Sequence, residues 1–357
     1  MKRTLHIIAP YPQGEAPSQR FRYEQYLPFF EKEDWEIKYH SFHSRASWNR
    51  LYHPGKFPLK ILDVFVNMFR RWILLLRLIG AKHIFMHREM AHIGPPVFEW
   101  ILVKILRRKY HYDFDDAIWI PNYSAANAKF QQLKCYWKVP KLIKWANSVS
   151  AGNEYLVNYA LQFNKNVTRI PTTIDTKNQH NVSVDHSQSP TVIGWTGTHS
   201  TMHYLDRLIP VLRKLENEFE FEFLVISNKK PNYELRSLRY MDWKLETEIE
   251  DLSKIQIGLM PLVYDMWSEG KCGFKALQYM ALGMACVVSP VGVNTTIVQH
   301  KENGFVADTE EEWENSLREL LTDSELRKTL GEQAKRSIEE NWSVKAWKEQ
   351  YMLLIEN

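Results

Sequence analysis

Hydrophobic and polar positions follow two different periods along the first half of the chain. Short apolar runs bounded by turn residues indicate strands, and longer runs with apolar residues three and four apart indicate helices. On this basis we predict strands at 5–11, 35–42, 83–87 and 110–115, a strand ending in a turn at 146–153, and helices at 20–32, 60–80 and 96–108. This alternation favours a parallel sheet covered by helices.

A second alternation follows the polar, turn-rich segment 173–191, which is expected to be an interdomain linker. Here we predict a strand and turn at 191–197 and strands at 220–227, 240–244, 254–262 and 284–289. The predicted helices are 200–219, one beginning near Phe274, 310–323 and 325–342. Ser343 is expected to cap a last helix. The second half therefore repeats the architecture of the first.

Together the two halves predict an α/β protein with two Rossmann-like, doubly wound domains facing across a cleft. A chain of 357 residues is too long for one ordinary core. We predict an N-terminal domain at 1–180 and a C-terminal domain at 188–342, with the last helix, 343–357, packing back on the first domain. Sheets of this kind bind ligands at the carboxyl ends of their strands.

The composition is that of a soluble globular protein, with 45% hydrophobic and 25% charged residues. Three cysteines without paired spacing argue against a disulfide framework or a zinc site and favour a reducing compartment. The first apolar segment is too short for a signal peptide. These features predict a cytoplasmic protein.

Charge is unevenly distributed. Residues 51–150 hold 16 Lys/Arg and 6 Asp/Glu, a balance of +10, so the remainder carries −6 of the total of +4. The basic residues are mixed with Leu, Ile and Trp at 56–83, 101–112 and 136–145, which fits contact with the anionic face of the inner membrane as a peripheral protein. The alternative is buried helices with solvated basic edges. No run approaches the roughly 20 residues of a membrane span, and no nucleic-acid module pattern appears.

One stretch, WSEGKCGFKALQ, places charge where core packing would prefer apolar residues. Lys271, Lys275 and Gln278 recur at spacings of four and three, so they can share one face of the first helical turns. A cation at a helix N-terminus opposes the helix dipole unless an anion also binds there. A diphosphate fits, held by the lysines and by the loop and helix start formed by Gly270, Lys271, Cys272, Gly273 and Phe274. A solvated helix end is the alternative.

A second turn, IGWTGTHST, links a strand to the next helix. Gly194 and Gly197 would allow a tight turn, and the hydroxyl of Thr198 and the helix N-terminus can bind an anion. Such turns also carry these residues without any ligand. The chain has no G-x-G-x-x-G pattern, which argues against a nicotinamide or flavin dehydrogenase.

The block GKCGFKALQYMALGMACVVSPVGVN and the tail from VQHKENGF to EENWS resemble family 4 retaining glycosyltransferases, which have the GT-B fold. The resemblance covers most of 190–343. It implies a metal-independent hexosyltransferase, with no cofactor, that moves a sugar from a nucleoside-diphosphate donor to an acceptor hydroxyl with retention. The basic, apolar N-terminal half in addition suggests an acceptor at the membrane, a glycan or lipid-linked molecule of cell-envelope or capsule synthesis.

The resemblance also implies residue roles. The second acid of the family's Glu-x7-Glu pattern, a ribose ligand, is Gln278 here. The position of the first acid, a sugar ligand, is Gly270, so that acid is either lost or shifted to the adjacent Glu269. Lys275 resembles the phosphate-binding basic residue, and Lys229 is the choice for a second basic group. A nucleotide-sugar epimerase and a non-catalytic nucleotide-sugar-binding protein remain alternatives.

In the N-terminal half, the loop 9–22 follows the first strand, where the family carries a glycine-bearing loop that faces phosphates and acceptor. Gly14, Arg20 and Arg22 are the residues expected there, and arginine forks bind phosphate well. A solvated helix start is the alternative.

Two further polar sets follow predicted strands. His87, Arg88 and Glu89 could orient the acceptor or the transferred sugar, although such a histidine is as often structural. Asp113 and Asp115 form an Asp-x-Asp that could hold a metal ion, but no metal is expected, because the donor machinery lies elsewhere. Asp115 and Asp116 are expected to face the acceptor or to cap the next helix.

Overall fold

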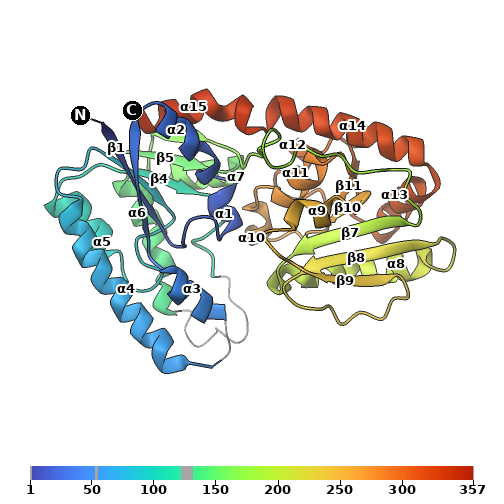
Figure 1. The fold of residues 1–357 in the computed structure, drawn as a ribbon, viewed down its shortest axis with the longest axis horizontal. Coiled ribbons are helices and arrows are strands. Elements are labelled where there is room, and N and C mark those ends of the chain that lie inside the picture. Colours follow the sequence, from blue (N-terminus) through green and yellow to red (C-terminus); the bar gives the residue numbers. More distant parts are fainter. Residues whose placement is uncertain (1, 53–54, 122–131, 357) are drawn as a thin grey trace. The chain divides into compact units, whose positions relative to one another are not determined.

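The computed structural model describes residues 2–52, 55–121 and 132–356 (Figure 1). The chain divides into two compact units: unit 1 is Met1–Thr172 with Trp347–Asn357, and unit 2 is Thr173–Ala346. The division precedes the segment 173–191. That segment is part of unit 2, where the amide of Val184 donates to the carbonyl of Leu282 over 2.9 Å.

Unit 1 contains a sheet of six strands in the order β2-β1-β3-β4-β5-β6. Every neighbouring pair is parallel, which is the arrangement that the alternation predicts. The direction in which successive strands are added to the sheet reverses between β1 and β3, which is the switch point of a doubly wound sheet. The loops after β1 and β3 therefore leave the carboxyl edge where such sheets bind ligands. The strands are β1 Arg3–Ala9, β2 Trp35–Ser41, β3 His83–His87, β4 His111–Phe114, β5 Ser148–Ala151 and β6 Val167–Arg169.

The helices of unit 1 differ in part from the prediction. The expected helix 20–32 is broken, because Pro28 lacks an amide donor and starts a new helix after a 3₁₀ turn at Glu24–Tyr26. The expected helix 96–108 is a short α-helix followed by a π-turn, Ile101–Ile105. The α-helices are α1 Pro17–Arg20, α2 Leu27–Lys32, α3 Arg45–Tyr52, α4 Phe57–Arg77, α5 Val97–Trp100, α6 Val139–Trp145 and α7 Glu154–Leu161.

The last helix, α15 (Val344–Glu356), contributes its residues from Trp347 onward to unit 1. The Tyr351 ring stacks on Tyr26 with centroids 4.1 Å apart, and Glu356 pairs with Arg3 at 2.8 Å. At its start the Ser343 hydroxyl accepts the amide of Ala346 over 3.1 Å, so the predicted cap is present.

Unit 2 also has six strands, in the order β12-β11-β10-β7-β8-β9, and each neighbouring pair is parallel. Figure 1 labels β7 to β11 of this sheet. Counted within the unit, this is the doubly wound order 6-5-4-1-2-3, whose switch point lies between β7 and β10. The strands are β7 Thr191–Gly197, β8 Phe221–Ser227, β9 Leu238–Asp242, β10 Ile257–Met260, β11 Ala285–Val288 and β12 Phe305–Val306.

The predicted helix 200–219 begins as a 3₁₀-helix, His199–Leu208, and becomes α-helical only at α8, where Pro210 occupies the first turn. The other predicted helices of unit 2 are present. The α-helices are α8 Ile209–Leu215, α9 Glu248–Leu252, α10 Met266–Glu269, α11 Phe274–Ala281, α12 Asn294–Ile297, α13 Glu310–Thr322 and α14 Ser324–Asn341.

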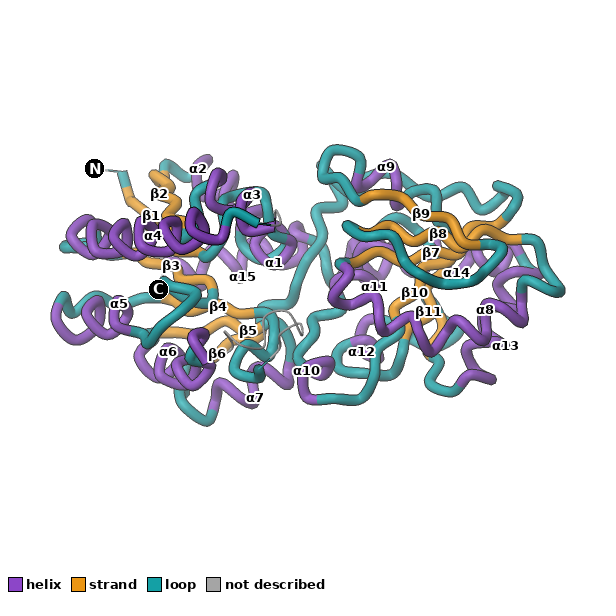
Figure 2. Tube along the Cα trace, turned by 90° about the horizontal axis from the view of Figure 1, so that it is seen from below, coloured by secondary structure: helices purple, strands orange, loops and turns teal. Residues whose placement is uncertain are grey.

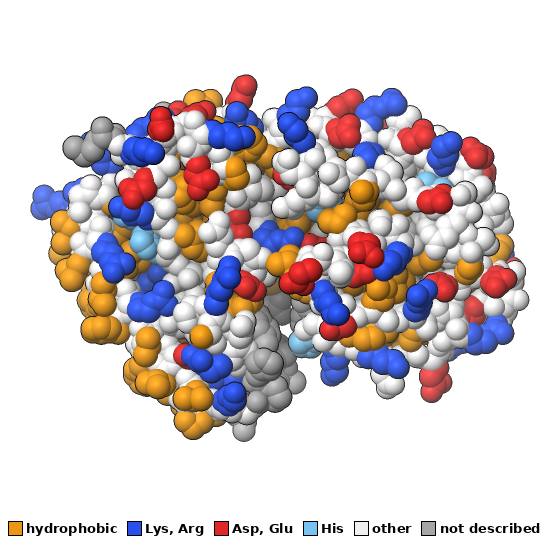
Figure 3. All heavy atoms as spheres, viewed as in Figure 1, with side chains coloured by type: hydrophobic (Ala, Val, Ile, Leu, Met, Phe, Trp, Pro, Cys, Tyr) orange, Lys and Arg blue, Asp and Glu red, His pale blue; other side chains and the backbone are white. Residues whose placement is uncertain are grey.

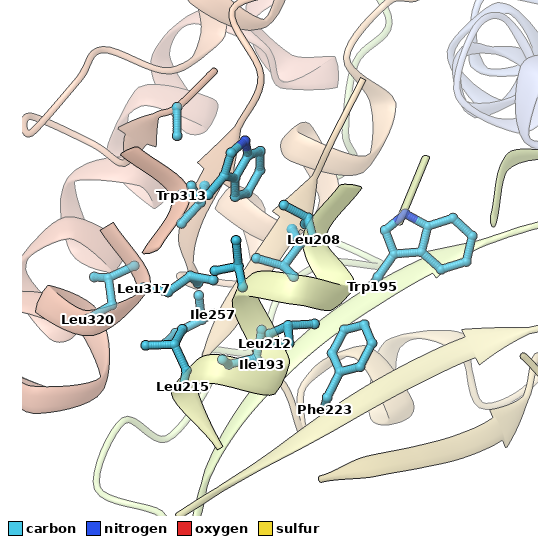
Figure 4. Packing of buried hydrophobic residues seen from close by; sticks show 14 of the residues in the cluster. Ile193, Trp195, Leu208, Leu212, Leu215, Phe223, Ile257, Trp313, Leu317 and Leu320 are labelled. Atoms are coloured by element: carbon cyan, nitrogen blue, oxygen red, sulfur yellow. The ribbon is translucent and has the colours of Figure 1, made fainter. Parts of the chain in front are cut away.

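The two faces of the unit 2 sheet bury different residues, as strand alternation requires. Ile193 and Trp195 of β7 join the apolar cluster that contains Leu212 of α8 and Trp313 of α13 (Figure 4). Gly194 of β7 is within the strand, where a Cβ would lie 2.3 Å from the Ile255 side chain. The expectation that Gly194 forms a turn is therefore wrong: the residue gives room to Ile255.

Helices lie on both sides of each sheet (Figure 2). No helix in the described ranges has the length and apolar character needed to span a bilayer.

Candidate functional site

At the switch point of unit 2, the end of β7 meets the start of α11. Gly197 ends β7, and a Cβ on it would lie 2.6 Å from the Trp195 ring and 3.0 Å from Cε of Lys275. The Lys275 ammonium lies 5.5 Å from the centre of the Trp195 ring. Only a residue without a side chain allows this approach, so the structure brings together Gly197 and Lys275, which the sequence singled out separately.

Tyr279 fixes this face of α11 to the sheet. Its buried hydroxyl accepts the backbone amide of Thr196 over 2.9 Å, and burial raises the pKa of the phenol. Gly258 of β10 makes room for the ring, because a Cβ there would lie 2.5 Å from it. Tyr279 follows Lys275 by four residues, so both share one helical face. Sequence reasoning missed Tyr279, whose only signal was its spacing from Lys275.

The loop before α11 needs a glycine at one position. Gly273 has φ +69°, and a Cβ there would lie 2.2 Å from Cδ1 of Ile297. Gly270 has φ −74°, a conformation open to any residue. The amides of the first turn of α11 have no intrahelical acceptors and lie at the positive end of the helix dipole, which suits an anion. Cys272, between the glycines, is buried.

The prediction that Lys271, Lys275 and Gln278 share one face of the first helical turns is wrong, because Lys271 precedes α11. The Gln278 side chain is 1% exposed, and its Nε2 lies 3.3 Å from Nε2 of His180. Lys271 is in the loop between α10 and α11, with its ammonium 5.7 Å from the centre of the Trp267 ring. Gln278 therefore packs against the segment that precedes β7, because a helix pressed on a sheet leaves little of its circumference open.

The other predicted donor-side residues also lie near the carboxyl edge of this sheet. Thr198 follows β7 and is exposed, and its hydroxyl lies 2.8 Å from that of Ser200. Lys229 is exposed two residues after β8, whose last residue pairs in register with Gly197. Glu269, half-buried, ends α10, and Phe274, also half-buried, begins α11.

In unit 1, a buried ionic network lies under the carboxyl ends of β3 and β4. Asp113 accepts hydrogen bonds from the Arg22 guanidinium, from Nδ1 of His87 at 2.8 Å and from the hydroxyl of Ser150 at 2.6 Å. Arg22 also donates to the carbonyl of Ile170. The prediction of Arg22 as an open phosphate ligand is therefore wrong, because its side chain is fully buried.

This network keeps Asp113 ionised and fixes the orientation of the His87 ring. Burial alone would raise the pKa of Asp113, but the Arg22 charge and the His87 hydrogen bond hold that pKa well below its usual range. Asp113 bonds Nδ1 of His87, so Nε2 faces away from it. Nε2 has no hydrogen-bond partner among the described residues and lies 4.0 Å from Asp115.

Arg88 follows β3 in a left-handed conformation, with φ +62°. Its guanidinium bonds Asp115 and Asp116, at 2.7 Å in each case. The same two charges keep the pKa of Arg88 raised, against the lowering effect of burial. No helix begins after Asp116 in the described residues up to 121, so the helix-cap alternative for the two acids is wrong.

Glu89 connects the loops on both sides of the unit 1 switch point. Its carboxylate pairs with Lys138 at 2.7 Å and with Nδ1 of His92 at 2.9 Å. His92 in turn lies 3.2 Å from the Tyr11 hydroxyl, in the loop after β1. Burial would raise the pKa of Glu89, but Lys138 and His92 lower it to about 2.

The loop after β1 is held by side chains that sequence reasoning missed. Gln19 is fully buried and bonds both the amide and the carbonyl of Tyr11. Glu24 accepts the amide of Gly14 over 2.9 Å, and Gly14 itself has φ +86°. Arg20 is half-buried, with its guanidinium 4.9 Å from the centre of the Phe21 ring.

The Asp-x-Asp pair does not form a shared ligand set. Asp113 is engaged by Arg22, and Asp115 is engaged by Arg88. In the described part of the chain, no group of three or more His, Cys, Asp or Glu side chains is placed to hold a metal ion.

Two doubly wound parallel units, each with charged and polar groups at the carboxyl edge of its sheet, define the GT-B class of fold. Residues 187–337, which hold the β7–α11 site, match the family described as glycosyl transferases group 1. The chain thus has the fold of glycosyltransferases and contains a glycosyl transferases group 1 domain. No curated protein sequence matches it.

Solved structures agree on the fold along the whole chain. Sucrose-phosphate synthase from Thermosynechococcus elongatus has a TM-score of 0.73 at 12% identity, over 99% of this chain and 98% of that chain. HepE from Anabaena in complex with UDP-glucose has a TM-score of 0.66 at 14% identity, over 100% of both chains. An α,α-trehalose-phosphate synthase from Burkholderia vietnamiensis has a TM-score of 0.62 at 9% identity, over 100% and 99%. At these identities the likeness concerns the fold.

Proposed function

We propose that this protein transfers a hexose-like sugar from a nucleoside-diphosphate donor to an acceptor hydroxyl, with retention at the anomeric carbon. The observation that carries the proposal is the contact of Lys275 with Gly197 and Trp195 at the switch point of the glycosyl transferases group 1 domain. It places a cation at a helix N-terminus and a strand end, where doubly wound sheets bind phosphates.

On the donor side, we assign the diphosphate to Lys275, the first-turn amides of α11 and the loop that follows Gly197. Negative charge grows on the diphosphate as it leaves, and preorganised donors stabilise that charge most in the transition state. Lys229 and Lys271 supply further positive charge near this edge. Glu269 is proposed to contact the donor sugar. HepE has been solved with UDP-glucose, which makes UDP-glucose the first donor to test.

The reaction needs no dedicated side-chain base if it proceeds on one face of the sugar. The acceptor oxygen bonds to the anomeric carbon while the diphosphate oxygen leaves, and a phosphate oxygen of the leaving group takes the acceptor proton. We therefore propose a metal-independent reaction. Full activity after treatment with a chelator is expected, and loss of activity that Mg²⁺ or Mn²⁺ restores would contradict this part.

On the acceptor side, we propose the polar edge of unit 1. His87 is oriented by Asp113, and Glu89 by Lys138, so each presents a fixed hydrogen-bonding direction. Arg88, Asp115 and Asp116 form a neighbouring charged cluster. We propose that the acceptor is a glycan or lipid-linked molecule of cell-envelope or capsule synthesis, glycosylated at the cytoplasmic face of the membrane.

The donor assignment is tested by Lys275→Ala and calorimetry with UDP-glucose. A charged hydrogen bond contributes about 1.5–3 kcal/mol, so the dissociation constant should rise at least about tenfold. Lys328→Ala, at an exposed lysine on α14 of the same unit, is the control and should leave binding unchanged. Unchanged binding in Lys275→Ala would refute the phosphate assignment. Conversion of the donor to an isomer without any acceptor would instead indicate an epimerase.

A further inference from the structure

Helix α4 has an apolar face that is turned to solvent. Phe65 is 69% exposed, Phe69 65% and Leu76 68%. Spacings of three and four residues place these side chains on one side of the helix, and that side is apolar over most of its 21 residues. The members of this face, called here the α4 apolar face, are Leu62, Phe65, Val66, Phe69, Trp72, Ile73 and Leu76, all exposed.

The opposite side of α4 packs on unit 1 through two buried leucines, Leu74 and Leu75, and through two buried polar side chains. Arg71 is buried and donates to the backbone carbonyls of Ala9 and His40, each at 3.0 Å, and of Met90 at 2.5 Å. Asn67 is buried and donates to the Ser47 hydroxyl at 3.1 Å. A helix that only covers a core keeps its apolar residues inside and its polar residues outside. Helix α4 instead buries Arg71 and Asn67 beside its leucines and exposes its largest apolar side chains. The α4 apolar face is therefore not explained by folding of unit 1.

Neighbouring elements extend the apolar surface. The Trp72 ring packs edge-on against Phe98 of α5, with centroids 5.2 Å apart. Beyond this contact, Val97, Trp100 and Ile105 are exposed on α5 and the π-turn. Together with the α4 apolar face and Ile79, these residues form a larger exposed apolar surface than the scattered single residues of an ordinary protein surface.

Apart from Asp63, the exposed charges on α4 and the segment that follows it are positive. Residues 64–88 contain no Asp or Glu, and Asp63 is engaged by Arg50 at 2.7 Å. Figure 3 shows the orange hydrophobic side chains along the lower left, where Figure 1 draws α4, with blue Lys and Arg side chains beside them. The exposed cations on α4 and the adjoining segments are Lys56, Arg70, Arg77, Lys82, Lys104, Arg107 and Lys109.

We propose that the α4 apolar face inserts into the interfacial layer of a phospholipid bilayer that carries anionic headgroups. At 1.5 Å per residue, α4 would lie about 30 Å along the membrane plane. Phe65, Phe69 and Leu76 enter the acyl boundary, and Arg70 and Arg77 pair with headgroup phosphates. A basic, aromatic amphipathic helix binds in this way through buried apolar area together with attraction to anionic lipid. This deepens the acceptor part of the proposed function, since it brings the enzyme to a lipid-linked acceptor.

The test is flotation of the full-length protein with vesicles of phosphatidylcholine alone or with one third phosphatidylglycerol. Wild type should float with the anionic vesicles, and rising salt should weaken the charge contribution. The double variant Phe65→Glu/Phe69→Glu should lower the partition coefficient at least about tenfold, because it removes two apolar groups and adds two like charges to the lipid surface. Arg70→Glu/Arg77→Glu should abolish the preference for anionic vesicles.

Matched controls are Leu161→Glu and Lys165→Glu, at exposed positions on and just after α7 of the same unit. Both should bind vesicles as wild type does, and all variants should keep wild-type circular dichroism and UDP-glucose affinity. Equal binding of wild type and Phe65→Glu/Phe69→Glu would overturn the proposal. So would a wild-type dimer in sedimentation that this variant dissociates while neither protein binds vesicles. Vesicle binding needs no transfer reaction, so its outcome is independent of whether the donor assignment holds.

Discussion

At the scale of single residues, Gly273 decides whether the donor-side loop can form. Its backbone is left-handed, and the space where a Cβ would lie is filled by Ile297. Gly80 is also left-handed, with φ +84°, but nothing lies within 4 Å of its Cβ position. An alanine at Gly80 would therefore show only the cost of the left-handed backbone, whereas an alanine at Gly273 would add the overlap with Ile297.

We expect Gly273→Ala to destabilise the protein by about 3 kcal/mol or more, since backbone strain and overlap with Ile297 add. Gly80→Ala should cost only about 1–2 kcal/mol, the strain alone. Urea unfolding of both variants measures the difference. Equal losses in the two variants would show that Ile297 moves aside without cost.

Glu89 should give a pH-dependent contribution to stability. Its pKa is lowered to about 2 in the folded protein from an ordinary value of 4.5. A carboxylate with a depressed pKa stabilises the fold above its ordinary pKa, and the contribution is lost as the pH falls from about 4.5 towards 2. Groups that face Glu89 are Lys138 and His92, and burial lowers the pKa of His92.

Glu89→Gln isolates this contribution. At pH 7 the variant should be less stable than wild type by up to about 3 kcal/mol, and the difference should shrink towards pH 3. Urea midpoints of both proteins across this range are the measurement. A difference that stays constant with pH would show that the loss comes from packing and not from the charge of Glu89.

At the scale of secondary-structure elements, the donor site depends on how α11 is attached to β7. The hydrogen bond from Thr196 to Tyr279 orients the helical face that carries Lys275, and Gly258 allows the ring to reach the sheet. The site is thus positioned by a side chain that would touch no ligand. Unit 1 uses the same principle, because Arg22 and Asp113 orient His87 from beneath the sheet edge.

Tyr279→Phe should therefore weaken donor binding without removing any ligand group. The buried amide of Thr196 loses its acceptor, which costs about 1–3 kcal/mol of stability. We expect UDP-glucose affinity to fall a few-fold through the loosened helix. Tyr240→Phe is the control, because that hydroxyl lies near solvent, and it should change little. An unaltered affinity in Tyr279→Phe would mean that packing alone holds α11 in place.

At the scale of the whole molecule, the two proposed activities belong to different units. The donor site lies within unit 2, and the α4 apolar face lies within unit 1. Effects of distant substitutions usually add. The variant Lys275→Ala should bind vesicles like wild type, and Phe65→Glu/Phe69→Glu should bind UDP-glucose like wild type.

A combination of the three substitutions should show both defects, each at its separate size. Flotation and calorimetry on the same preparations give the comparison. A defect in vesicle binding caused by Lys275→Ala would show that the two units are coupled, and the assignment of one activity to each would then need revision.

Local patterns in the sequence predicted much of the fold. The strand β3 was placed at its observed bounds, and the cap by Ser343 is present. Errors arose where proline or side-chain packing overrides periodicity, as in the broken helix at 20–32 and the 3₁₀ start at His199. Gly194 was wrongly predicted to form a turn. In the sequence, a glycine that forms a turn looks the same as a glycine that leaves room for a neighbouring side chain, as Gly194 does for Ile255.

For the site, the sequence alone determined which chemical groups are present: two lysines and a glycine loop at a helix start, and a basic, apolar segment at 56–83. The sequence did not determine which of these side chains are exposed to solvent. Only the tertiary structure turned Gln278 and Arg22 inward, brought Gly197 against Lys275, and pointed the apolar side of α4 to solvent. The physical reason is that residue type and spacing fix what a side chain can bind, whereas burial and partners depend on contacts between residues far apart in the chain, such as Arg22 with Asp113 and Gln278 with His180.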